Sequence, residues 1–200
     1  MRSTAPEKYN VRQAINMKEI PTDTTQVVRE GVERACKEFS ARIAPLGFTR
    51  TKKVFWIRRN PYTVEFIHLH RSGSTYGKPI NYSVDFRIHF AIRVLNDTFE
   101  APALNGPFSD AGRLREGRYH LRFNAQTSST YDRCIDDLAR FVSEQGEPWF
   151  SKFRNCEMLL ASSDSPLREA DKERLQSALN GQSDPEVVSA SLKMLGIKGN

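Results

Sequence analysis

Four histidines and one carboxylate form the clearest set of residues able to do chemistry in this chain of 200 residues. His68 and His70 are two residues apart in TVEFIHLHR, and alternation along a strand places both side chains on one face. Asp85 and His89 share a face of YSVDFRIHFAIRV, and His120 follows in RYHLRF. Imidazole and carboxylate ligands suit zinc and other transition metals. One prediction is therefore a metal-dependent enzyme using His68, His70 and His89, although their spacing matches no recognised metal motif.

Other catalytic patterns are weaker. Cys36 and Cys134 fall on apolar helical stripes, which is typical of small core residues, and Cys156 lies in no known nucleophile signature. The sequence contains neither GxGxxG nor GxxxxGK[ST], and we expect no cofactor. An odd number of cysteines without a CxxC pair indicates reduced thiols rather than a disulfide framework. These features favour a binding protein over an enzyme.

Positive charge is concentrated in one part of the chain. The net charge is +6, and residues 49–93 hold nine Lys and Arg against two Asp and Glu, a local net charge of +7. Such an excess attracts nucleic acid or an acidic protein, but basic residues also keep exposed strands soluble. No apolar run reaches the length of about 20 residues that a membrane span needs. The N-terminus lacks the apolar region of a secretory signal, so we expect a cytoplasmic protein.

The elements that must position these residues can be predicted from periodicity. Residues 82–94 alternate strictly, with one set formed by Val84, Phe86, Ile88, Phe90 and neighbours of the same parity, which is typical of a strand with a core face. The opposite set is Ser83, Asp85, Arg87, His89, Ala91 and Arg93. What this second set contacts is the main functional question that the sequence raises.

The order of elements predicts an α+β fold. We expect a helix over about 24–44, strands at 49–59 and 63–71 joined as a hairpin, a long strand at about 80–95, a short strand at 118–123, and a helix over about 131–145. The predicted fold is an antiparallel sheet of about four strands, covered on one face by helices and open on the other. The predicted divisions are a flexible arm over 1–21, an α+β core domain over 22–153 and a helical C-terminal appendage over 154–200.

The stretch LGFTRTKKVFWIRR resembles the start of an uncharacterised bacterial family, domain-of-unknown-function family 4304. The residues that carry this resemblance are Gly47, Phe48, Arg50, Phe55 and Arg58, followed by HLHRS, the alternating strand and a late helix with a Trp. It covers roughly residues 24–153. The family pattern has a Gln where this chain has His70, so a polar site of the family would differ in this chain at that position. The resemblance supplies no catalytic residues and supports the fold alone.

These observations predict a non-enzymatic binding domain that acts through the polar, basic face of its sheet. The predicted contact residues are Asp85, Arg87, His89 and Arg93, with His68, His70, Arg58 and Arg71 beside them. The expected partner is a protein, as for an accessory or neutralising subunit. Single-stranded nucleic acid is the alternative partner, because basic strands with aromatic residues can stack bases. We expect no contact with a membrane.

Overall fold

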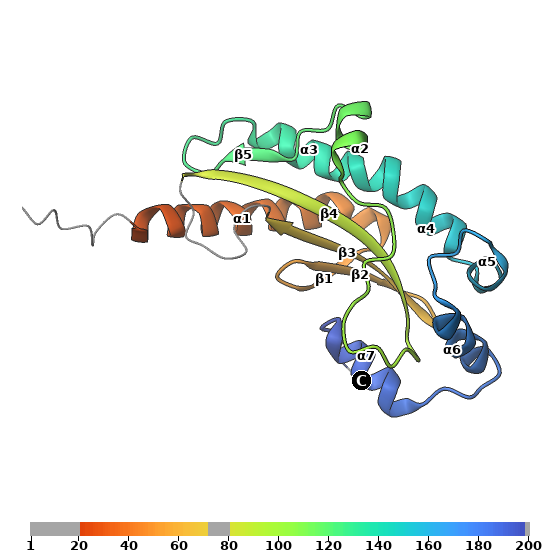
Figure 1. The fold of residues 1–200 in the computed structure, drawn as a ribbon. Coiled ribbons are helices and arrows are strands. Elements are labelled where there is room, and N and C mark those ends of the chain that lie inside the picture. Colours follow the sequence, from red (N-terminus) through yellow and green to blue (C-terminus); the bar gives the residue numbers. More distant parts are fainter. Residues whose placement is uncertain (1–20, 72–80, 199–200) are drawn as a thin grey trace, which may run out of the picture.

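The computed structural model describes residues 21–71 and 81–198, and it has the predicted α+β fold with an antiparallel sheet (Figure 1). The sheet has five strands in the order β1-β2-β3-β4-β5, each antiparallel to its neighbour. Their bounds are Thr49–Lys52, Phe55–Arg59, Thr63–Arg71, Ser83–Val94 and Arg122–Asn124. The fifth strand arises because the segment predicted as one strand over 49–59 turns at Lys53 and Val54 into β1 and β2.

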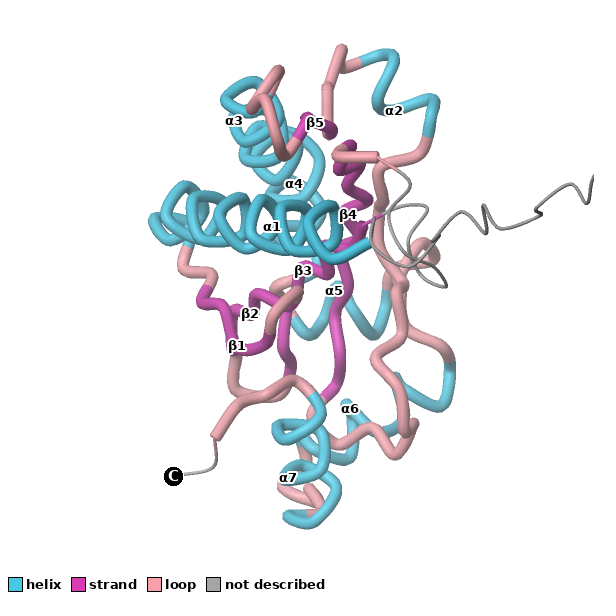
Figure 2. The backbone as a smooth tube through the Cα atoms, turned by 90° about the vertical axis from the view of Figure 1, so that its left-hand side faces the viewer, coloured by secondary structure: helices cyan, strands magenta, loops and turns pink. Residues whose placement is uncertain are grey.

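Seven α-helices surround this sheet in the described part of the chain. They are α1 (Pro21–Ile43), α2 (Ala111–Glu116), α3 (Tyr131–Phe141), α4 (Glu147–Phe153), α5 (Cys156–Ala161), α6 (Glu169–Leu179) and α7 (Pro185–Met194). Helices α1, α3 and α4 pack on one side of the sheet, whereas α7 lies beneath it in both ribbon views (Figures 1 and 2). None of the described helices has both the length and the apolar character that crossing a lipid bilayer requires.

Strand register defines the two faces of the sheet. Phe90 lies opposite Ile67 and Ile88 lies opposite Leu69, and these side chains belong to the core beneath α1, α3 and α4. We call this side the helix-covered face. Residues of the other parity, including the cross-strand pair His68 and His89, lie on the second face. The predicted core parity of the alternating strand is therefore confirmed, since Val84, Phe86, Ile88, Phe90, Ile92 and Val94 are all buried on the helix-covered side.

The loop after β4 folds back and pairs with the free edge of that strand. The backbone amide of Phe90 donates to Pro107 O at 2.9 Å, and a β-bridge joins His89 to Phe108. The side-chain amide of Asn105 imitates a strand residue, because it accepts from Ile92 N at 3.0 Å and donates to Ile92 O at 2.9 Å. These contacts satisfy backbone groups that an edge strand would expose.

The C-terminal helices are part of the same packed structure. Leu159, Leu167 and Leu175, from the segment predicted as an appendage, belong to the core of the helix-covered face. Leu192 of α7 and Leu195, the residue just after that helix, instead lie on the second face and belong to a smaller core there. The prediction of one open face is therefore wrong for part of the sheet. The predicted arm over 1–21 lies almost wholly outside the described residues.

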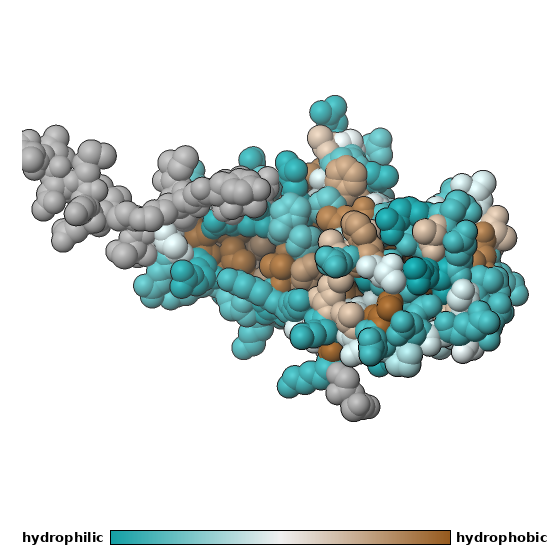
Figure 3. Space-filling view, turned by 60° about the horizontal axis from the view of Figure 1, so that its bottom comes forward, coloured by the Kyte–Doolittle hydropathy of each residue, from teal (hydrophilic) through white to brown (hydrophobic). Residues whose placement is uncertain are grey.

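This smaller core is formed by one half of the second face and by the chain's own C-terminal segment. Its buried members from the sheet and the turn that follows β4 are Ile57, Val64, Phe66, Ala91 and Leu95. Hydrophobic residues also gather in a surface strip at the end of the molecule where α1 begins, with hydrophilic residues on either side (Figure 3).

A π-helical turn, Val142–Gly146, joins α3 to α4. The helix was predicted to end at about residue 145, but the π-helical turn continues without a break into α4, and Pro148 is the second residue of that helix. Gly146 lies against the ring of Phe90, and a Cβ atom there would be 2.8 Å from Phe90 Cζ. Such a distance is too short for van der Waals contact, so the close approach requires glycine.

Gly146→Ala should destabilise the fold by about 1–3 kcal/mol, because the added methyl group overpacks a core ring. The free energy of unfolding can be measured by urea denaturation. Ser143→Ala, an exposed change in the same π-helical turn, is the control and should shift stability by less than about 0.5 kcal/mol. Equal effects of the two changes would contradict this packing argument.

Candidate functional site

A row of five rings crosses the half of the second face that α7 leaves open. Ring centroids lie 4.6 Å apart for Phe55 and His68, 5.2 Å for His68 and His70, 5.2 Å for His70 and His89, and 5.1 Å for His89 and Phe108. Adjacent rings are inclined by 6–36°, so most meet face against face. We call these residues the ring row: Phe55, His68, His70, His89 and Phe108.

Cross-strand pairing explains why these rings meet. Phe55 of β2 lies opposite His68 of β3, which lies opposite His89 of β4, which bridges to Phe108 on the edge segment. Opposite residues of an antiparallel pair have Cβ atoms about 4.5–5.5 Å apart, close enough for aromatic contact. All five side chains are partly or well exposed, and Phe108 is the most exposed, at 43%.

The histidines of the ring row are held in the neutral form at pH 7. Burial lowers the pKa of His68 to about 4, and its neighbours His70 and His89 add to this shift. Burial also lowers the pKa of both His70 and His89, with a further contribution from the nearby charge of Arg87. The Nδ1 atoms of His68 and His70 are buried and form no hydrogen bond with another described residue. Protonation would place positive charges against one another in a partly dry row.

The same geometry argues against the predicted metal site. A metal ion needs lone pairs that converge on one point, and these lone pairs lie in the ring planes. The rings of His70 and His89 are inclined by only 22°, and His68 is inclined by 36° to each of them. Within residues 21–71 and 81–198, no group of three or more His, Cys, Asp or Glu side chains is arranged to hold a metal ion. His120 makes no ring contact with the row, and its backbone amide donates to Asp137 instead.

Five of the eight predicted site residues do come together on the second face. His68, His70 and His89 stand in the ring row, while Asp85 and Arg87 lie on the same face of β4 and are exposed. Arg122 of β5 stands opposite Asp85. The open half of the second face therefore has an aromatic centre and a charged margin at one end.

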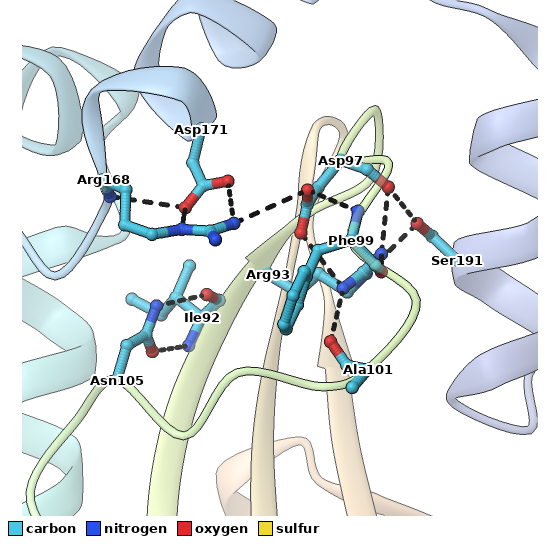
Figure 4. Close-up of polar contacts among 9 residues, drawn as sticks. All are labelled: Ile92, Arg93, Asp97, Phe99, Ala101, Asn105, Arg168, Asp171 and Ser191. Atoms are coloured by element: carbon cyan, nitrogen blue, oxygen red, sulfur yellow. Dashed lines mark hydrogen bonds and ion pairs between the residues drawn. The ribbon is translucent and has the colours of Figure 1, made fainter.

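Arg93 does not belong to that open surface, and its prediction as a contact residue is wrong. Its side chain is buried, and the residue is only 4% exposed. The guanidinium donates to Asp97 O at 2.9 Å, Phe99 O at 2.8 Å, Ala101 O at 3.1 Å and Ser191 Oγ at 3.1 Å (Figure 4). It also pairs with the Asp97 carboxylate at 3.1 Å. Arg93 thus fastens a loop and α7 to the sheet.

Arg58 and Arg71 stand on the helix-covered face, so both were predicted beside the wrong surface. Arg58 faces Glu65 in the register, pairs with that fully buried carboxylate, and donates to Leu46 O at 2.6 Å. A second ion pair, at 3.0 Å, joins Arg58 to Glu147 of α4. Arg71 lies opposite Phe86 in the register. Because Arg58, Arg71 and Arg93 do not lie on the open surface, this surface is less basic than the sequence indicates.

Two members of the ring row, Phe55 and Phe108, were missed from the sequence. The parity of Phe55 was hidden because β1 and β2 read as one strand, with an irregular register between Arg50 and Lys52. Phe108 lies in a segment that reads as a loop and carries no strand signal. Cys36 and Cys134 are buried as predicted, and burial raises the pKa of these thiols to about 11 and 12, which keeps both protonated at neutral pH.

Comparison with known proteins adds no relative. No family model matches the chain, and no curated protein or solved structure gives a match. The resemblance to domain-of-unknown-function family 4304 therefore stays a prediction.

Arg93→Met should destabilise the protein by about 3–5 kcal/mol, because it removes the donor of the Phe99 and Ala101 carbonyls and the cation that pairs with the Asp97 carboxylate. Amide hydrogen exchange in α7 should accelerate. Arg87→Met is the matched control, since Arg87 has the same parity on the same strand but is exposed. If both variants exchange alike in α7, Arg93 does not fasten that helix.

His68 should make stability depend on pH. Its pKa is about 4 when folded and about 6.5 when unfolded, so the unfolded state binds more protons between these values. The contribution of His68 to stability is therefore complete above pH 6.5 and is lost as the pH falls towards 4. Urea denaturation at pH 7.5 and at pH 4.5 gives the loss in free energy of unfolding between these two pH values. This loss should be smaller in His68→Gln than in the wild type by about 2 kcal/mol, a figure that allows for solvent screening of a partly exposed ring. An unchanged difference would contradict the assignment.

Proposed function

We propose that the chain is a protein-binding domain whose contact surface is the ring row with its margin of Asp85 and Arg87. The observation that supports this proposal is the partly exposed row itself, which is built from three strands and an edge segment. Protein interfaces concentrate their binding energy in central aromatic and Arg residues surrounded by polar ones. A rigid sheet holds these side chains before a partner arrives, which reduces the entropy lost on binding.

Exposed apolar side chains of the segment that carries Phe108 support the same proposal. Phe108 is 43% exposed, and Leu104, four residues before it in the chain, is 44% exposed. Exposed apolar patches are typical of surfaces that a partner covers. The neutral state of the three histidines lowers the cost of removing water from this surface, since no charge has to be buried.

The ring arrangement favours a protein over single-stranded nucleic acid. Bases stack on free ring faces beside basic groups. In the ring row, the faces of His68, His70 and His89 already meet neighbouring rings, so mainly their edges are left for a ligand. Edges offer a nitrogen donor or acceptor and apolar CH groups, which suit protein side chains.

Affinity capture from cells of the native host tests this proposal. The wild-type chain should retain a protein that survives nuclease treatment, and Phe108→Glu with Arg87→Glu should reduce its recovery about tenfold or more, because both changes fall in the proposed contact surface. Leu179→Glu is the control, because Leu179 is also an exposed large apolar residue but belongs to α6. Recovery that depends on nucleic acid, or that both kinds of variant reduce equally, would overturn the proposal.

A further inference from the structure

A cleft of about 310 Å³ lies on the helix-covered side of the sheet, where α1 begins, and it is separate from the ring row. Its walls are Val32 of α1 and Val54 of the turn between β1 and β2. Leu69 of β3 and Phe86 of β4 form its floor, and both are buried. The strip of hydrophobic residues in Figure 3 lies at this end of the molecule.

The rim of this cleft is basic. Arg29 lines it from α1, Lys53 lines it from the turn between β1 and β2, and Arg71 lines it from β3. None of the described lining residues is acidic. The nearby Glu33 is held by Arg50 through two hydrogen bonds of 2.7 and 2.9 Å, so its carboxylate is already neutralised. Arg29 and Lys53 are both exposed and form no ion pair with a described residue.

This combination selects a chemical class of ligand. Small-molecule sites are concave and mostly apolar, with a few polar groups that fix orientation, and volumes near 300 Å³ are at their lower limit. An apolar floor between cations matches a molecule with an apolar body and one acidic group. The hydroxyl of Thr25 also lines the cleft and can donate a hydrogen bond to that acid.

We propose that this cleft binds a small amphipathic anion, of which a medium-chain carboxylate is the simplest form. The hydrocarbon chain lies on Leu69 and Phe86, and the carboxylate meets Arg29 and Lys53 at the rim. The site is independent of the proposed protein contact, because it stands on the opposite face of the sheet.

Titration of the full ¹⁵N-labelled chain with octanoate, followed by NMR, tests the proposal. Amide shifts should concentrate at residues 25–32, 53–54, 69 and 86. The double variant Arg29→Gln with Lys53→Gln should weaken octanoate binding about tenfold, because two charge contacts are lost. The same variant should bind 1-octanol as the wild type does, since the alcohol carries no charge. Arg115→Gln, an exposed change on α2, should leave both affinities unchanged.

Filling the cleft provides a second test. Val32→Trp should abolish binding of both octanoate and octanol while circular dichroism shows an intact fold, and Val54→Phe serves if the first variant does not fold. Absence of octanoate binding at millimolar concentration would overturn the proposal. Binding that ignores both the charge and the filling variants, or shifts confined to other elements, would also overturn it.

Discussion

The buried guanidinium of Arg93 is the contact that determines how the second face of the sheet is divided. A charged group costs several kcal/mol to bury unless its donors are satisfied, and a guanidinium has five of them. Arg93 meets this demand with three carbonyls of one loop, the Asp97 carboxylate and the hydroxyl of Ser191. Such a set is complete only when the loop and α7 are both in place. The contact therefore specifies where the C-terminal helix docks.

Docking of α7 leaves the other half of the second face available. Apolar residues around Phe66 and Ala91 are covered by Leu192 and Leu195, and the ring row begins beside them. The two halves differ in chemistry, since one is a small core and the other is an aromatic surface with polar edges. The edge segment with Phe108 extends that surface beyond β4 without exposing backbone groups of the strand. The ring row is held in position because it stands on a sheet whose other face packs against the main core.

The part of this structure that the sequence could predict follows from the alternation of apolar and polar residues along single strands. The period of two in residues 82–94 identifies the core face of β4, and the shared parity of His68 and His70 places them together. Their meeting with His89 also follows from the hairpin order of the strands. Arg58 could have been placed by the same reasoning, since pairing across the turn at 60–62 aligns it with Glu65.

Contacts between distant segments were beyond the sequence. Ser191 lies 98 residues from Arg93, and no local pattern in either segment predicts that their side chains are in contact. Alternation places Arg93 on the polar face, and only tertiary packing shows that this end of the face is buried. Phe108 is similar, because Asn105, Gly106 and Pro107 indicate a turn but do not show that the chain returns there to pair with His89.

Hydrogen exchange of the purified complex with its protein partner would test the central claim most directly. The claim is that the open half of the second face is the contact surface. Binding should slow exchange in peptides covering residues 68–70, 85–89 and 106–109, while α3 and the covered half beneath α7 keep the rates of the free protein. Protection confined to α1, α3 and α4, with unchanged rates across the ring row, would contradict the account.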